Sequence, residues 1–183
     1  MQIFLLNTDP IVSAQSLADT HVRVICREIT MLLSTWYYYN GPDQRLPYKP
    51  MSKNQPLIKQ LSNPEARKWA IRNAGAIFAE FNYRFGKKHA SEEKYNQLLE
   101  YITKYDKFNQ VYTLCSWSFV GKGIGIFHNL YLHNAIEKYR RYYIDKINSM
   151  KVPCTYTKRE PPLWINNNQG MFEKHEVWTY KKF

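Results

Sequence analysis

Cysteine is scarce in this chain, and its few cysteines form no recognisable pattern. Cys26, Cys115 and Cys154 lie far apart and include no C-x-x-C pair. An odd number at such spacings argues against a disulfide framework and against a zinc ribbon. A reducing compartment fits best, so we expect a cytoplasmic protein.

Long apolar runs and targeting signals are also missing. No apolar stretch approaches the length that crosses a membrane. The opening residues, MQIFLLNTDP, contain a short apolar run without a basic segment before it or a small-residue cleavage site after it. We therefore expect neither a signal peptide nor a membrane partner.

The sequence lacks the common motifs of metal and nucleotide chemistry. It contains no Walker, H-E-x-x-H or G-x-S-x-G pattern. Gly121, Gly123 and Gly125 do not have the spacing of a dinucleotide-binding loop. His128 and His133 do not share a helical face, which disfavours a metal pair. We expect no cofactor and no metal.

Acidic residues are few relative to basic ones. The chain has 15 Asp and Glu against 26 Lys and Arg, a formal net charge of +11 and a pI near 9.5. Such an excess attracts polyanions, and nucleic acid is the first candidate partner. Tyrosine and tryptophan are also abundant, and both stack on bases as well as fill protein cores.

Apolar periodicity and end signals predict four helices. The best-marked one opens at Asn63 and Pro64 and stops at Gly86, because these residues are typical of a cap, a first position and a C-terminal stop. Ser13 and Asn134 are the expected caps of two others. The expected spans are Ser13 to about Tyr39, Pro64 to Phe85, Ser91 to about Tyr105 and Asn134 to about Met150.

The segments between these helices complete the expected fold. Gln2 to Leu6 reads as a buried extended arm, residues 41–62 as a Pro-rich connection and residues 106–133 as a flexible loop. Residues 151–183 form a wrapped aromatic-basic tail anchored at Trp164, Phe172 and Trp178. The whole chain, 1–183, is predicted to be a mainly α, single-domain helical bundle with a long loop.

The first predicted helix has a carboxylate on its apolar face. His21 and Glu28 are separated by two turns and so lie about 10 Å apart along the axis. A carboxylate among apolar side chains is costly unless it is paired or used, which makes Glu28 a candidate catalytic group. The alternatives are a buried hydrogen bond to another helix, or a shifted face that turns Glu28 to water. Because they recur every three or four positions, six side chains are expected on this face of the helix: Leu17, His21, Val24, Glu28, Met31 and Thr35.

Two basic clusters are candidate phosphate contacts. Residues 81–91 gather cations around a helix end, where they suit phosphates or simply complement the helix dipole. Residues 138–143, KYRRYY, place Arg140 and Arg141 between tyrosines, which suits phosphate contact with base stacking or a solvated edge. The polar side chains of the first cluster are Tyr83, Arg84, Lys87, Lys88 and His89.

Residues 17–21, LADTH, followed by residues 27–29, REI, resemble the first helix of the phage pyrimidine-dimer DNA glycosylases of the endonuclease V type. The match is close over about a dozen positions. The tail sequence KREPPLW, with Arg159, Pro162 and Trp164, is more loosely similar to the end of that family.

The resemblance implies a specific chemistry. Enzymes of that family attack C1′ of a damaged nucleotide with an N-terminal amine, displace the base and nick the strand by β-elimination without a metal. Their helical glutamate, which handles protons, matches Glu28. Their DNA contacts match His21 and Arg27. Because Gln2 is too large for ordinary removal of the initiator, the amine here would be that of Met1.

We therefore expect a DNA glycosylase or AP lyase-like enzyme that acts on a damaged or modified pyrimidine in duplex DNA. Glu28 and Met1 are the expected catalytic residues. The alternatives are an enzyme of free nucleotides and a non-enzymatic binding protein for nucleic acid, a host factor or a small anionic ligand. The expected DNA contacts are His21, Arg27, Arg84, Lys87, Lys88, Arg140, Arg141, Arg159 and Trp164.

Overall fold

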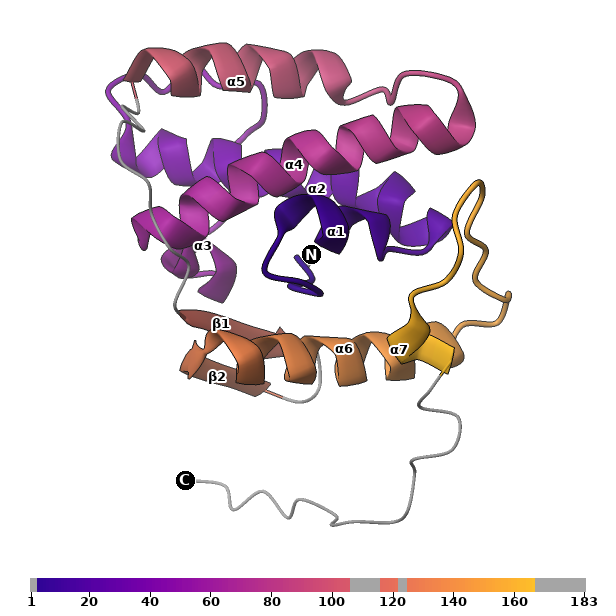
Figure 1. Cartoon of the computed structure of the whole chain (residues 1–183). Helices are drawn as coiled ribbons and strands as arrows, with labels where there is room; N and C mark the ends of the chain where they lie inside the picture. Colours follow the sequence, from indigo (N-terminus) through magenta and orange to yellow (C-terminus); the bar gives the residue numbers. More distant parts are fainter. Residues whose placement is uncertain (1–2, 106–115, 122–124, 167–183) are drawn as a thin grey trace.

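The computed structural model of the chain describes residues 3–105, 116–121 and 125–166 (Figure 1). Met1, Cys115, Gly123 and the expected anchors Phe172 and Trp178 lie outside the described residues. The described part is mainly helical, as predicted. Its elements are α1 (Pro10–Gln15), α2 (Asp19–Asn40), α3 (Pro56–Gln60), α4 (Pro64–Phe85), α5 (Glu92–Tyr105), β1 (Ser116–Gly121), β2 (Gly125–Tyr131), α6 (Leu132–Asn148) and α7 (Leu163–Asn166).

The predicted first helix is two helices, α1 and α2, which are separated at residues 16–18. Asp9 caps α1 by accepting hydrogen bonds from two backbone N–H groups of its first turn, so the prediction of Ser13 as the cap was wrong. The Ser13 hydroxyl instead donates to the Phe4 carbonyl and accepts from the Leu6 N–H, both at 3.1 Å. Ser13 therefore holds the N-terminal segment against α1.

Residues 3–6 form the buried extended segment that their apolar run predicts. None of these four side chains is more than 4% exposed. The segment lies between α1 and α6 in Figure 1, and the Arg140 Nε of α6 donates to the Leu6 carbonyl at 2.9 Å. The segment is thus part of the hydrophobic core.

The helix α4 has the boundaries that its end signals predict. The Asn63 side chain accepts from two N–H groups of the first turn, Pro64 occupies the first position and Gly86 follows the last turn with φ 63°. A positive φ of this size favours glycine over other residues. The next helix, α5, also agrees with its prediction and begins at Glu92.

Residues 116–131 contain a β-hairpin where a flexible loop was predicted, and that prediction was wrong for both strands. The strands β1 and β2 pair antiparallel, with Ser116 opposite Tyr131 and Gly121 opposite Gly125. Trp117 of β1 is buried, and its ring lies 5.1 Å from that of Trp69 in an edge-on contact. The hairpin therefore packs its tryptophan into the core rather than standing free in solvent.

The helix α6 follows β2 directly and begins at Leu132, before the predicted Asn134. Its N-cap position is Tyr131, whose side chain makes no capping hydrogen bond, so the predicted capping box was wrong. Glu137 instead pairs with the exposed His133 of the same helix at 3.3 Å. The start of α6 is therefore set by the end of the hairpin and not by a local cap.

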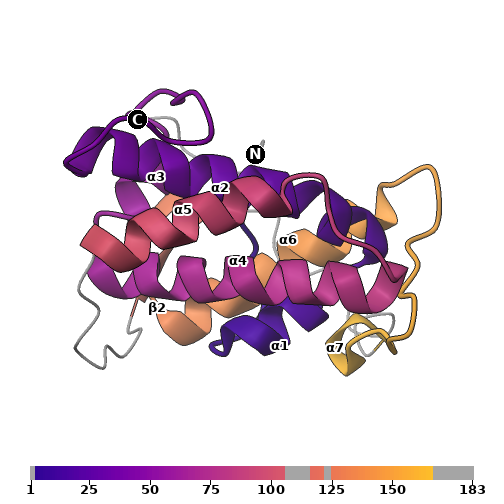
Figure 2. The ribbon, with the colours of Figure 1, turned by 90° about the horizontal axis from the view of Figure 1, so that it is seen from above.

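One hydrophobic core joins these elements. The helices α2, α4 and α5 run side by side in Figure 2, while α6 lies on the opposite side of the core in Figure 1. The buried side of α2 passes through Val22, Ile25, Ile29 and Leu33. Cys26 is buried in the same core, and it and Cys154 are free thiols.

The described part of the C-terminal tail, residues 151–166, passes back over the start of α2 and the end of α4. The Asp19 N–H donates to the Thr155 carbonyl at 2.9 Å, and the Lys158 Nζ donates to the Tyr83 carbonyl at 2.9 Å. Residues 167–183 of the predicted tail lie outside the described residues. Within the part that the structure places, none of the helices has the length and apolar character that crossing a bilayer requires.

Replacing Ser13 with alanine will lower the free energy of unfolding by about 1–3 kcal/mol, because the buried Leu6 N–H loses its acceptor. Urea unfolding followed by circular dichroism measures this change. Ser62→Ala, at an exposed position, is the matched control. Equal unfolding midpoints for the two variants would contradict the role assigned to Ser13.

Candidate functional site

The outer face of α2 borders a groove of about 410 Å³, which we call the α2 groove. Because Val22, Ile25, Cys26 and Ile29 face the core, Arg23, Val24, Arg27 and Glu28 lie on the outward side of the helix. The predicted apolar stripe was wrong in this respect, since Val24 is 49% exposed. The groove is lined by Arg23, Val24, Arg27, Glu28, Met31 and His89.

Arg23 and His89 form the wall of the α2 groove nearest to α4. The Arg23 guanidinium lies 3.9 Å from the centroid of the Phe85 ring, which fixes the arginine by a cation–π contact. The His89 Nε2 donates to the Arg23 carbonyl at 3.0 Å, and the His89 Nδ1 accepts from the Ser91 N–H at 3.0 Å. These partners specify the neutral Nε2–H form of the ring.

The electrostatics of the α2 groove come from its arginines and its carboxylate. Burial lowers the pKa of His89, although the Arg23 carbonyl and Glu92 oppose the shift, so the imidazole stays neutral. Arg23 and Arg27 are exposed and Glu28 is half-buried. Two guanidiniums suit phosphate oxygens, and a carboxylate beside them suits proton transfer to a bound group.

Two of the predicted site residues come together at this groove, and two more lie close to it in the sequence. Arg27 and Glu28 line it, and the exposed Lys87 and Lys88 lie two residues and one residue before His89, which also lines it. Arg23 was missed, although its place one turn before Arg27 on an outward face was a usable signal.

The structure places His21 inside the protein rather than in the α2 groove. Its Nδ1 shares a hydrogen bond of 2.9 Å with the Tyr143 hydroxyl, which also accepts from the Ala18 N–H at 2.7 Å. The Phe4 ring packs edge-on against the imidazole at 5.4 Å. Burial, with a smaller contribution from the charge of Lys146, lowers the pKa of His21 from 6.5 to about 4. His21 is therefore a neutral core residue.

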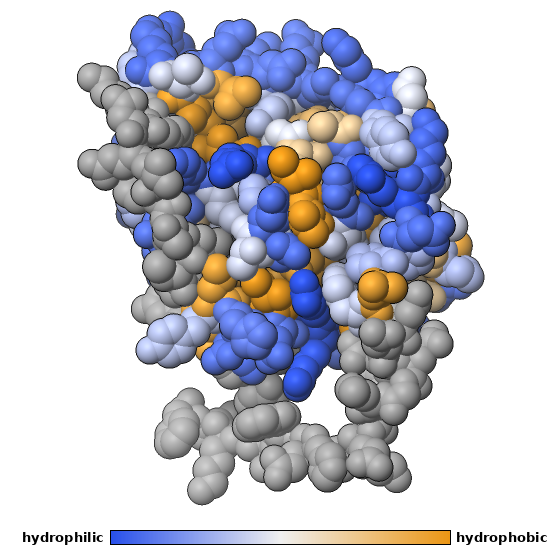
Figure 3. Space-filling model, viewed as in Figure 1, coloured by the Kyte–Doolittle hydropathy of each residue, from blue (hydrophilic) through white to orange (hydrophobic). Residues whose placement is uncertain are grey.

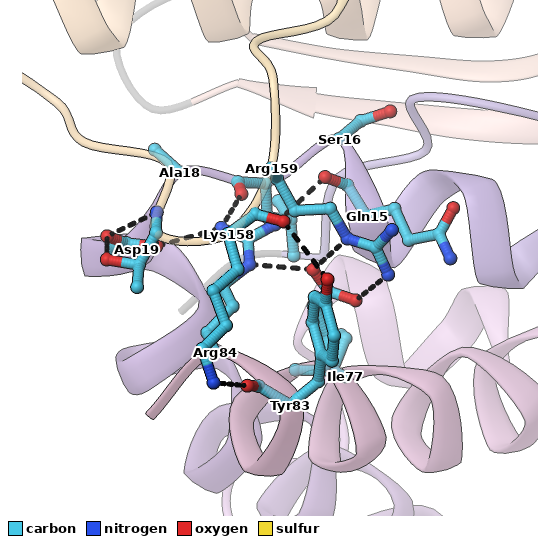
Figure 4. Close-up of polar contacts among 12 residues, drawn as sticks. Gln15, Ser16, Ala18, Asp19, Ile77, Tyr83, Arg84, Lys158 and Arg159 are labelled. Carbon is cyan, nitrogen blue, oxygen red and sulfur yellow. Dashed lines mark hydrogen bonds and ion pairs between the residues drawn. The ribbon is translucent and has the colours of Figure 1, made fainter. Parts of the chain in front are cut away.

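Arg84 is also buried, at the centre of a charged cluster between α2, α4 and the returning tail (Figure 4). Its Nε donates to Glu80 at 2.7 Å and its Nη1 to Asp19 at 3.0 Å. The remaining donors reach the carbonyls of Leu17 at 2.7 Å and Gln15 at 2.9 Å. Every nitrogen of the guanidinium is thus used within the protein, which removes Arg84 from the expected DNA contacts.

The tail closes this cluster, which we call the Arg84 cluster: Asp19, Glu80, Arg84, Thr157 and Arg159. Arg159 donates from Nε and Nη2 to the two oxygens of Glu80 at 2.8 and 2.9 Å. The Thr157 hydroxyl donates to Asp19 at 2.7 Å. The cluster contains two carboxylates and two guanidiniums, so its charges balance, as buried charges require.

Hydrogen bonds and charges in the cluster shift the pKa of both carboxyl groups. Burial alone would raise the pKa of Asp19, but hydrogen bonds from Thr157, Thr155 and Arg84 outweigh it and hold the pKa below 3.8. Burial of Glu80 is likewise outweighed by Arg159 and Arg84, which hold its pKa below 4.5. Both groups are ionised at neutral pH, and the cluster is a structural one.

The DNA contacts that were predicted in α6 and in the C-terminal tail do not line the α2 groove. The Arg140 Nε is used by the Leu6 carbonyl, and the Arg140 guanidinium lies 5.2 Å from the centroid of the half-buried Trp164 ring. Burial lowers the pKa of Arg140. Arg141 is exposed on α6. The expected nucleophile, Met1, lies outside the described residues.

Comparisons with known proteins identify no relative of this chain. No protein-family model, no curated protein and no solved structure matches it. Among the residues that the structure places, no group of three or more His, Cys, Asp or Glu side chains is arranged so that it could hold a metal ion.

Stability will fall in two steps as the pH is lowered. Between pH 6.5 and about 4 the unfolded chain binds a proton at His21 that the folded protein does not. The free energy of unfolding therefore drops in this window, by up to about 3 kcal/mol, with a further contribution from His89. Below about pH 4 a second loss follows, as Asp19 and Glu80, whose folded pKa values are depressed, become protonated.

Urea unfolding midpoints between pH 7 and pH 2.5 test this profile. His21→Gln should remove most of the first step and leave the second. His133→Gln, at an exposed histidine, should leave both steps unchanged. A first step that persists in full in His21→Gln would show that His21 does not cause it.

Proposed function

We propose that this protein binds duplex DNA through the α2 groove and that Glu28 serves there as the acid–base group of a base-excision reaction. One observation supports this most strongly: Arg23 and Arg27 border the same groove as Glu28. These are the residue types that hold phosphates and move a proton, and they come from one helical face.

The electrostatic surroundings support DNA as the ligand. Lys87 and Lys88 extend the basic surface beyond the groove, next to its His89 wall. The net charge of +11 attracts a polyanion from a distance. A duplex bound here would have its phosphates held by these cations while the target nucleotide is turned out of the stack toward Glu28.

The proposed reaction follows the resemblance of α2 to the phage pyrimidine-dimer glycosylases. The amine of Met1 forms a bond to C1′, the glycosidic bond breaks, and the departing base takes the electron pair and a proton. The amine loses a proton and the sugar ring opens to an imine. Removal of a C2′ proton then expels the 3′ phosphate. Glu28 is the proposed group that donates and accepts these protons.

The test is incubation of the purified protein with duplexes that carry an abasic site or a pyrimidine dimer, with borohydride added. A trapped protein–DNA adduct accompanied by nicking is the expected result. DNA binding without an adduct or nicking would contradict the proposed enzymatic activity and would support a DNA-binding protein without catalysis.

Glu28→Gln should reduce nicking by at least about 100-fold, because a general acid–base group is lost. Its dissociation constant for the same duplex should stay within about threefold, since no cation is removed. Glu100→Gln, at an exposed position on α5, is the control and should nick like the parent protein. Full nicking activity in Glu28→Gln would remove Glu28 from the site.

Substituting both Arg27 and Lys87 with alanine should flatten the salt dependence of DNA binding. Each lost phosphate contact lowers the slope of log affinity against log salt concentration by about 0.9. Lys53→Ala combined with Lys59→Ala, two exposed lysines elsewhere, is the charge-matched control. The same slope in both double variants would place the DNA contact on another surface.

A further inference from the structure

A second groove lies between α1 and α4, and we call it the α1–α4 groove. Its volume is about 510 Å³, and it shares no lining residue with the α2 groove. Small side chains of α4 form its floor and α1 forms one wall. The residues that define its character are Ile11, Arg72, Ala76, Ala79, Tyr83 and Arg159.

The centre of the α1–α4 groove is apolar and faces solvent. Ile11 is 50% exposed, and the neighbouring Val12 is 40% exposed. Ala76 and Ala79 lie opposite on α4 and leave room beside the isoleucine. Figure 3 shows this face, where hydrophobic surface over α1 is flanked on both sides by strongly hydrophilic surface. An exposed branched side chain above a row of alanines favours insertion of another apolar side chain.

Arginines occupy both ends of the α1–α4 groove. Arg72 and Tyr83 are eleven residues apart on α4, which corresponds to about 16 Å along the helix. The Arg159 guanidinium lies 4.6 Å from the centroid of the Tyr83 ring, at the second end. The groove is therefore an apolar centre with a guanidinium at each end.

Both arginines retain capacity for an anion. Arg72 is exposed and has no ion pair with a described residue. Arg159 uses Nε and Nη2 for Glu80, and its Nη1 makes no hydrogen bond within the part of the chain that the structure describes. Glu80 itself is neutralised by Arg84 as well as by Arg159. Arg72 therefore brings an unbalanced positive charge to one end, and at the other end Arg159 offers its Nη1 as a donor beside a charge-balanced cluster.

The charge and polarity of the α1–α4 groove favour some classes of ligand over others. A second copy of this chain, with a net charge of +11, would be repelled by two arginines. A nucleic-acid backbone would satisfy the arginines but would set phosphates over an exposed isoleucine. An acidic peptide satisfies both parts, since its carboxylates pair with guanidiniums and its apolar side chain fills the centre.

We propose that the α1–α4 groove is a docking site for an acidic segment of a partner protein. The segment inserts an apolar side chain between Ile11 and the α4 alanines, and it sets one carboxylate against Arg72 and another against Arg159. Carboxylates about 16 Å apart correspond to roughly eleven residues of helix or five of extended chain. This site is independent of DNA binding at the α2 groove.

The experiment is a selection of random 12-residue peptides on the full chain, with counter-selection on a variant that combines Ile11→Ser and Arg72→Glu. Both positions are exposed, and circular dichroism of the variant is the check that it folds. The expected result is enrichment of peptides in which Asp or Glu flanks a large apolar residue. Absence of enrichment, or enrichment of basic or neutral peptides, overturns the proposal.

The consensus peptide is then titrated calorimetrically against single variants. Arg72→Glu should weaken its binding by at least about tenfold. Lys59→Glu, which makes the same charge change on α3, should change it by less than about twofold. Equal effects of the two substitutions contradict the site. If Arg72→Glu instead weakens a 12-nucleotide single strand and not the peptide, the groove belongs to nucleic acid and the proposal fails.

Discussion

The buried guanidinium of Arg84 is the interaction on which the arrangement of this fold depends. A charge without solvent must be matched by counter-charges and acceptors, and Arg84 finds them in four separate places: Gln15, Leu17, Asp19 and Glu80. Two of these are carbonyls at the junction of α1 and α2, where the chain leaves its helical path. The same carboxylates bind Thr157 and Arg159, so the returning tail is fixed by the charge that fixes the helices.

This use of charge decides which basic residues are available to a ligand. Arg84 and Arg140 act within the protein, where their guanidiniums bind carbonyls, carboxylates or an aromatic ring. Arg159 gives two of its three nitrogens to Glu80. What remains on the outside of α2 is a pair of arginines around Glu28, and on the other side of α4 an apolar groove between Arg72 and Arg159. Because the two grooves have different chemistry, we propose different ligands for them, nucleic acid for the first and an acidic peptide for the second.

Local signals explain which elements were predictable. The ends of α4 were predicted because Asn63, Pro64 and Gly86 act within one turn of the positions they determine. The hairpin was missed because its closely spaced glycines are equally typical of a flexible loop, and the strand pairing and the packing of Trp117 against Trp69 depend on residues far along the chain or on another strand. Ser13 was misread as a cap because its true partners, Phe4 and Leu6, precede it in an extended segment.

The sequence by itself determined the helical class, the ends of α4, the burial of residues 3–6 and the presence of Arg27 and Glu28 on one helix, because each depends on neighbours within a few positions. Only the tertiary structure decided that His21 and Arg84 are core residues while Arg23 and Glu28 face a groove. The partners responsible, such as Tyr143 for His21 and Asp19 for Arg84, are 122 and 65 positions away. Burial depends on what packs against a side chain, and helical periodicity does not specify which face of a helix meets distant parts of the chain.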